Sequence, residues 1–140
     1  MGRLRKFANQ APVIFSAHFT AGEAADKQVF TADRDYELLE IIEVHRIAGA
    51  ASSTAMIEKT PSGTAPGSGT DLHGTAFAAD STADTPVHKT VSNGGLVAAF
   101  TTRLIKRGQS LAVDFTGTVT AYEGAFTFVL RPTNGAQSPY

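Results

Sequence analysis

The amino-acid sequence predicts an all-β protein, an antiparallel β-sandwich with a jelly-roll-like arrangement and an extended N-terminal arm. Tracts in which Val, Ile, Phe and Thr alternate with polar residues recur along the 140-residue chain, and this pattern is typical of half-buried strands. Clusters of Gly, Pro, Ser and Asn separate the tracts at intervals of about 8–12 residues, the spacing of sandwiches and barrels. Short strands joined in this way do not suit a parallel sheet, which needs long crossover connections.

Length and composition limit the classes of protein to consider. A chain of 140 residues suits one domain with one core, and we divide it into an arm at 1–12, a sandwich at 13–132 and a flexible C-terminal tail at 133–140. The net charge of -1 gives no reason to expect binding to nucleic acid or anionic lipid. The absence of cysteine excludes disulfides and thiolate zinc sites. No tract approaches the roughly 20 apolar residues of a membrane helix.

The N-terminal arm is basic. Arg3, Arg5 and Lys6 fall within the first ten residues, and no acidic residue lies among them. Two interpretations stay open for the arm, a solvated and disordered terminus or an ordered contact with a partner. After the arm, an alternating tract at 13–20 predicts the first strand, and a short tract at 28–31 predicts the second.

The segment 36–47 allows two interpretations. Its apolar residues and its glutamates recur near every third position, as in a short amphipathic helix. Its isoleucines and valine are β-branched and its neighbours are strands, so we predict one long strand. A regular strand would place Glu40 and Glu43 on opposite faces, which requires a β-bulge or an edge that faces another subunit.

The middle of the chain alternates short strands with polar connections. A strand is predicted at 54–60 and is followed by 61–70, a Gly- and Pro-rich segment without a core-forming side chain. A connection of this length within a small domain is a surface loop that is either functional or disordered. A brief apolar segment follows at 72–79, and a further strand is predicted at 87–91.

The last third of the sequence carries the clearest β signal. An Asn-Gly pair at 93–94 predicts a tight hairpin that leads into a strand at 96–105. A second alternating tract at 111–120, a turn at 123–124 and a final tract at 126–130 follow. Together they predict a meander of neighbouring antiparallel strands.

The residues that carry chemistry do not form a recognisable local motif. The four histidines are far apart in the sequence, and only Asp71 and His73 place two metal-ligand types close together. The segment 67–69 lacks the spacing of a nucleophile elbow, and it is followed by no lysine that would complete a phosphate-binding loop. We therefore expect a protein that is not an enzyme, with no catalytic residue, no metal and no cofactor.

Features in a fixed order between residues 36 and 132 resemble those of a known family. They are a strand that ends Glu43-Val44-His45, a strand that ends Glu58-Lys59, the loop 63–70, the turn 107–111 and the closing tracts 113–117 and 126–132. In this order the chain resembles the capsid decoration proteins of tailed bacteriophages, also called cement or head-stabilising proteins.

The resemblance implies a virion protein that is made in the host cytoplasm and sits on the outer capsid surface. It implies a homotrimer that bridges subunits of the major capsid protein, without direct contact to nucleic acid or membrane. For contacts with the capsid or between subunits we predict the following residues: Arg3, Arg5, Lys6, Phe7, Glu37, Glu40 and Glu43. The alternatives are a receptor- or glycan-binding head-fibre or tail appendage, and a small hydrolase or isomerase, whose histidine and carboxylate site the spacing does not supply.

Overall fold

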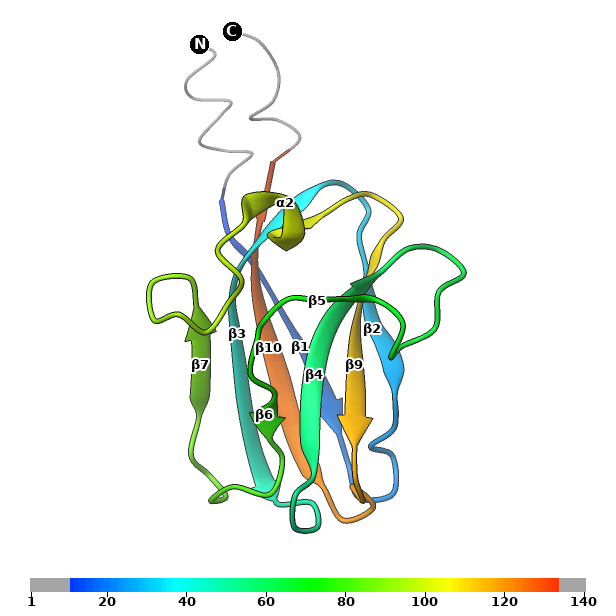
Figure 1. The fold of residues 1–140 in the computed structure, drawn as a ribbon, viewed down its shortest axis with the longest axis vertical. Coiled ribbons are helices and arrows are strands. Elements are labelled where there is room, and N and C mark those ends of the chain that lie inside the picture. Colours follow the sequence, from blue (N-terminus) through cyan, green and yellow to red (C-terminus); the bar gives the residue numbers. More distant parts are fainter. Residues whose placement is uncertain (1–10, 134–140) are drawn as a thin grey trace, which may run out of the picture.

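The computed structural model describes residues 11–133, which form two antiparallel β-sheets packed face to face (Figure 1). Sheet A has the order β1 (Val13–Phe19), β10 (Glu123–Pro132), β3 (Tyr36–Ile47) and β7 (Val87–Thr90), and β8 (Leu104–Ile105) also pairs with β3. Sheet B has the order β2 (Lys27–Thr31), β9 (Ser110–Thr116), β4 (Thr54–Thr60) and β5 (Thr70–Asp71), and β6 (Phe77–Ala78) also pairs with β4. The predicted all-β sandwich is confirmed.

Aromatic side chains from both sheets fill the space between them. Phe126 of sheet A lies edge-on to Phe19, Phe77 and Phe115, with ring centroids 6.1, 5.7 and 6.3 Å away. Edge-to-face pairs at such separations add to the free energy gained by burying the rings. Because the inward positions alternate along β1 and β10, their remaining side chains point away from the core and form the outer face of sheet A.

The segment 36–47 is one strand, as predicted, and it contains a β-bulge. Val129 of β10 lies opposite Glu40, whereas the next residue, Leu130, lies opposite Leu38, so Leu39 is the extra residue. The strand is not an edge, because β10 pairs along one side and β7 and β8 along the other. A bulge is therefore present, but it lies ahead of Glu40, so Glu40 stays on the outer face and Glu43 faces the core.

The predicted strand at 96–105 is wrong. Its second half is the one-turn helix α2 (Phe100–Arg103) followed by the two-residue strand β8. Helix α2 is far too short to cross a membrane, and no other helix of the described residues is long and apolar enough to do so. The ammonium group of Lys59 donates hydrogen bonds to the backbone carbonyls of Thr101 and Leu104. These carbonyls therefore have hydrogen-bond donors without pairing with a neighbouring strand.

The predicted hairpin at Asn93-Gly94 is also wrong, although the turn itself forms. Gly94 has a φ of 75°, and the Asn93 side chain accepts hydrogen bonds from the backbone of Thr90 and Gly95. The backbone N–H of Leu96 donates one hydrogen bond to the carbonyl of Thr90, but the chain forms no strand ladder with β7. The backbone N–H of Val97 donates to the carbonyl of Leu72, so the segment crosses toward the other sheet.

The predicted closing meander is wrong as well, because β9 and β10 belong to different sheets. The first of these strands ends at Thr116, and Glu123 and Gly124 begin the second and do not form a turn. Between them, Val119 and Tyr122 are buried and close one end of the core. Burial of these two side chains requires the connection to cross between the sheets, which a tight hairpin cannot do.

Candidate interaction surface

The outer face of sheet A combines apolar and polar side chains that are only partly buried. One row across it runs from Ile14 to Val129, Glu40 and Thr90, which pair in this order on four neighbouring strands. Ile14 is 69% exposed. The other apolar side chains of this face, all partly exposed, are Leu39, Ile42 and Val44. Contiguous exposed apolar surface with polar groups around it is characteristic of interaction sites.

A groove of about 480 Å³ lies on the outer face of sheet A near α2. Its lining combines apolar and charged side chains with the turn after β7: Glu37, Leu39, Glu40, Thr90, Val91, Ser92, Arg103 and Val129. Val91 is 39% exposed, and Phe100, on the same short helix as Arg103, is 46% exposed. A groove lined by apolar side chains and by the partly exposed carboxylate of Glu40 can receive an apolar side chain of a partner, with a cationic side chain beside it.

Glu37 lies in a buried ion network at the end of the sandwich near α2. Arg103 donates a hydrogen bond of 2.7 Å to Glu37 Oε2 and one of 3.1 Å to the Leu38 carbonyl, and Arg131 donates to Glu37 Oε1. Burial favours the protonated carboxyl, but the bonds from the two guanidinium groups outweigh it, so the pKa of Glu37 is lowered. Both carboxylate oxygens of Glu37 are used within the chain.

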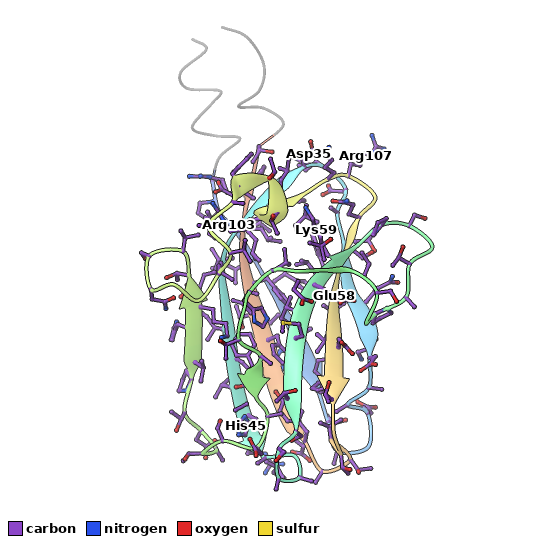
Figure 2. The ribbon with its side chains drawn as sticks, viewed as in Figure 1. Asp35, His45, Glu58, Lys59, Arg103 and Arg107 are labelled. Carbon is purple, nitrogen blue, oxygen red and sulfur yellow. The ribbon has the colours of Figure 1, made fainter. Side chains whose placement is uncertain are left out.

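Glu43 lies in a second buried network, at the opposite end of the sandwich, where Figure 2 places His45. The Tyr122 hydroxyl donates to Glu43 Oε1 at 2.7 Å, and His45 Nδ1 lies 2.8 Å from the same oxygen. His45 Nε2 lies 2.9 Å from the Ser81 carbonyl. Both ring nitrogens of His45 therefore face acceptors, which is the environment of an imidazolium.

The predicted contact role is wrong for Glu37 and Glu43, whereas for Glu40 it stays a prediction. Glu43 is 1% exposed and Glu37 is 7% exposed, so neither presents its carboxylate to a partner. Glu40 is partly exposed on the outer face of sheet A, where its carboxylate lies 2.9 Å from His88 Nδ1. The predicted contacts Arg3, Arg5, Lys6 and Phe7 lie outside the described residues.

The Asp71–His73 pair does not form a metal site. His73 is buried, its Nε2 accepts the backbone N–H of Ile57 at 2.9 Å, and its Nδ1 lies 2.7 Å from the Thr75 carbonyl. Burial lowers the pKa of His73 to about 4, so the ring is neutral at pH 7. Asp71 is exposed, and within residues 11–133 no three His, Asp or Glu side chains are placed to hold a metal ion.

The loop after β4 is fastened to the outer face of sheet B. Glu58 Oε1 accepts hydrogen bonds from the backbone of Gly67 and Gly69, and the Gln28 amide donates to the Thr64 carbonyl. Gly67 has a φ of 89°, a conformation that glycine adopts without strain. The loop thereby covers part of sheet B, whereas no segment within residues 11–133 covers the outer face of sheet A in this way; we call this face of sheet A the open face.

Replacing Glu58 with glutamine is expected to raise the melting temperature at pH 7 and to leave it unchanged below pH 4.5. Burial and the nearby carboxylates of Asp114 and Asp71 raise the pKa of Glu58 above 4.5, and the two glycine amides only partly oppose them. A raised carboxyl pKa costs stability above the folded-state value, and the cost disappears as pH falls below 4.5. Circular dichroism melts at both pH values test this, with Glu23→Gln as an exposed control; a gain that persists at low pH would contradict the argument.

Comparison of the chain with protein-family models, with curated proteins and with solved structures found no match. The described residues thus define the class: a β-sandwich in which a loop covers part of one sheet and the outer face of the other sheet is the open face. This face is partly apolar and also carries Glu40 and His88.

Proposed function

We propose that this protein is a structural component of a tailed-bacteriophage virion that decorates the capsid and stabilises it by bridging subunits of the major capsid protein. The resemblance in the order of sequence features supports this function, and the observation that carries it is the open outer face of sheet A. Its apolar residues, among them Leu39 and Val129, lie beside polar residues such as Glu40 and Thr90, a mixture that protein–protein interfaces share. The capsid protein is the proposed partner of this face.

Bridging stabilises a shell because the contacts must be lost before neighbouring capsid subunits can separate. Four strands at about 4.8 Å spacing and about 25 Å length give the face a plan area of roughly 500 Å². A stable interface buries about 800 Å² on each partner. One copy therefore holds the shell weakly, and several copies joined to one another hold it more tightly through multivalency. The homotrimer implied by the resemblance is one such assembly.

The decisive experiment mixes the full chain with shells that lack it. Saturable binding at a fixed ratio to capsid protein, with a higher melting temperature of the shell, is the expected result. Shells that neither bind the protein nor gain stability would refute the proposal. Binding to a glycan array in place of the shell would favour the appendage function.

Substituting aspartate for Val91 and Phe100 together is expected to weaken binding to the shell at least about tenfold, because the substitutions remove two exposed apolar side chains and would place two charges in the interface. Both side chains are exposed near the groove, so the fold should be retained. Ile47→Asp is the matched control, since Ile47 is equally exposed but lies at the far end of β3. Sedimentation of the variants with shells measures the effect, and equal weakening by the control would contradict the assignment of this face.

A further inference from the structure

The side chain of Arg103 has hydrogen-bond donors that the described chain leaves unused. Its Nη1 donates to Glu37 Oε2 at 2.7 Å and to the Leu38 carbonyl at 3.1 Å. Its Nε is buried and has no acceptor within residues 11–133, and Nη2 has no acceptor in that range either. A buried donor without an acceptor costs free energy, which a partner that supplies the acceptor recovers. Arg103 therefore points to a group that the described residues do not contain.

The unused donors form one edge of the guanidinium group. The N–H groups of Nε and Nη2 are parallel, and this fork matches the two oxygens of a carboxylate. The charge agrees with this geometry, because Arg103 and Arg131 both donate to the single carboxylate of Glu37. Two guanidinium groups and one carboxylate leave this network with a net positive charge. A second carboxylate would satisfy the free edge of Arg103 and balance that charge.

Arg103 lines the groove on the open face of sheet A, at the end of the sandwich where Figure 2 shows it beside α2. The 9% of its side chain that is exposed is the part that a ligand in the groove can contact. Val91 and Val129 supply apolar surface in the same groove. Glu40 also lines it, but its carboxylate lies 2.9 Å from Nδ1 of His88 on β7. The groove therefore has a cationic side at α2 and an anionic side at β7.

We propose that this groove binds an extended segment of the capsid protein in which an acidic side chain follows an apolar one. The carboxylate accepts hydrogen bonds from Nη2 and Nε of Arg103, and the apolar side chain contacts Val91 and Val129. Because Nε is covered in the free protein, the guanidinium group shifts toward the groove when the carboxylate binds. This inference rests on the proposed function, since it names the side chains that the capsid protein presents to the open face. Repulsion from Glu40 sets the direction of the segment, with its acidic residue toward α2.

Two dipeptides that differ in charge test the proposal without shells. N-acetyl-Leu-Glu-amide carries the proposed apolar and acidic side chains, and N-acetyl-Leu-Gln-amide has nearly the same shape without the charge. Titration of isotope-labelled protein, followed by NMR, is expected to give at least about fivefold tighter binding of the glutamate peptide. This peptide should also move the N–H signal of Arg103 Nε and the backbone signals of Val91 and Ser92. Equal affinity of the two peptides, or the absence of shifts in the groove, would overturn the proposal.

A matched pair of substitutions at Val91 tests whether the acidic side chain lies in the groove. Val91→Asp adds a carboxylate to the groove, and Val91→Asn has nearly the same shape without the charge. Val91 is 39% exposed, so both variants should fold. Val91→Asp is expected to bind the glutamate peptide at least about threefold more weakly than Val91→Asn, because like charges repel, whereas the glutamine peptide should not distinguish the variants. Equal binding of the glutamate peptide to both variants would overturn the proposal.

Shells separate this inference from the proposed function. Failure of the wild-type protein to bind shells, with the preference for the glutamate peptide intact, would refute the capsid protein as the partner and leave the preference of the groove standing. Saturable binding to shells together with equal affinity for the two peptides would refute the inference alone. The expected result is binding to shells that the glutamate peptide weakens and the glutamine peptide does not.

Discussion

Replacing Glu43 with leucine is expected to lower the free energy of unfolding by about 3–5 kcal/mol, the cost of removing one partner from a buried ion pair. Glu43 accepts from the Tyr122 hydroxyl and pairs with His45, and all three side chains are buried. The leucine would leave the hydroxyl and the imidazolium without their acceptor in the core. Urea denaturation at pH 6, followed by circular dichroism, measures the loss.

Two further substitutions identify the source of this loss. Tyr122→Phe removes one hydrogen bond and keeps the ring, so it should cost only about 1–2 kcal/mol. Glu123→Ala breaks an ion pair with Arg46, whose side chain is largely exposed, and should cost less than about 1 kcal/mol. A loss for Glu43→Leu no larger than for Glu123→Ala would contradict the role assigned to this network.

The free energy of unfolding of the wild-type protein is expected to depend on pH because of His45 in the same network. Burial favours neutral His45, but the hydrogen bonds to the Ser81 carbonyl and to Glu43 outweigh it and raise the pKa above its ordinary value of 6.5. A raised histidine pKa gives stability that is fully present below 6.5 and is lost as pH rises through the folded-state value. Wild-type stability should therefore fall across this window, and the fall should be smaller in Glu43→Leu.

The sequence predicts the two-sheet sandwich because alternation and turn residues are local signals. The strand β3 shows the limit of local reasoning. Glutamates at every third position resemble a helix, and only the register against β10 reveals that Leu39 is an inserted residue. With the bulge in place, Leu38 and Ile41 both face the core, as a strand with one buried face requires.

The errors in the last third of the chain have a common cause. Alternation predicts that a segment is a strand but not which sheet it joins, so β9 and β10 look like one meander. The short helix α2 depends on partners distant in sequence, since Lys59 and Glu37 hold it through Thr101, Leu104 and Arg103. No window of neighbouring residues contains these contacts.

The surface contacts were harder to predict than the fold. Negative charge suggested that Glu37 and Glu43 face solvent, but each is buried against a partner supplied by another part of the chain. Arg103, for example, is 66 residues from Glu37 in the sequence. The sequence does contain a signal that Arg103 is buried. It is an arginine within a tract of threonine and apolar residues, and an arginine that is buried with such a tract is usually paired with an acidic side chain.

Replacing Arg103 with methionine is expected to cost about 3 kcal/mol or more, whereas Arg131→Met should cost about 1 kcal/mol or less. Both arginines donate to Glu37, but the Arg103 side chain is buried and that of Arg131 is 41% exposed. Water can replace the exposed donor and cannot easily replace the buried one. Urea denaturation of the two variants at pH 7 measures the difference, and equal costs would contradict this reading of burial.

Acid titration of stability gives Arg103→Met a second, independent readout. The lowered pKa of Glu37 means that its contribution is present above its ordinary value of 4.5 and is lost as pH falls through the folded-state value. Glu58 titrates with the opposite sign, because amides and neighbouring carboxylates surround it instead of guanidinium groups. Arg103→Met should therefore flatten the acid-induced loss of stability that Glu37 causes, and Glu58→Gln should steepen the net loss. A change of the pH–stability profile in the same direction in both variants would contradict this explanation, in which charged guanidinium donors lower the pKa of Glu37 and uncharged amide donors fail to lower that of Glu58.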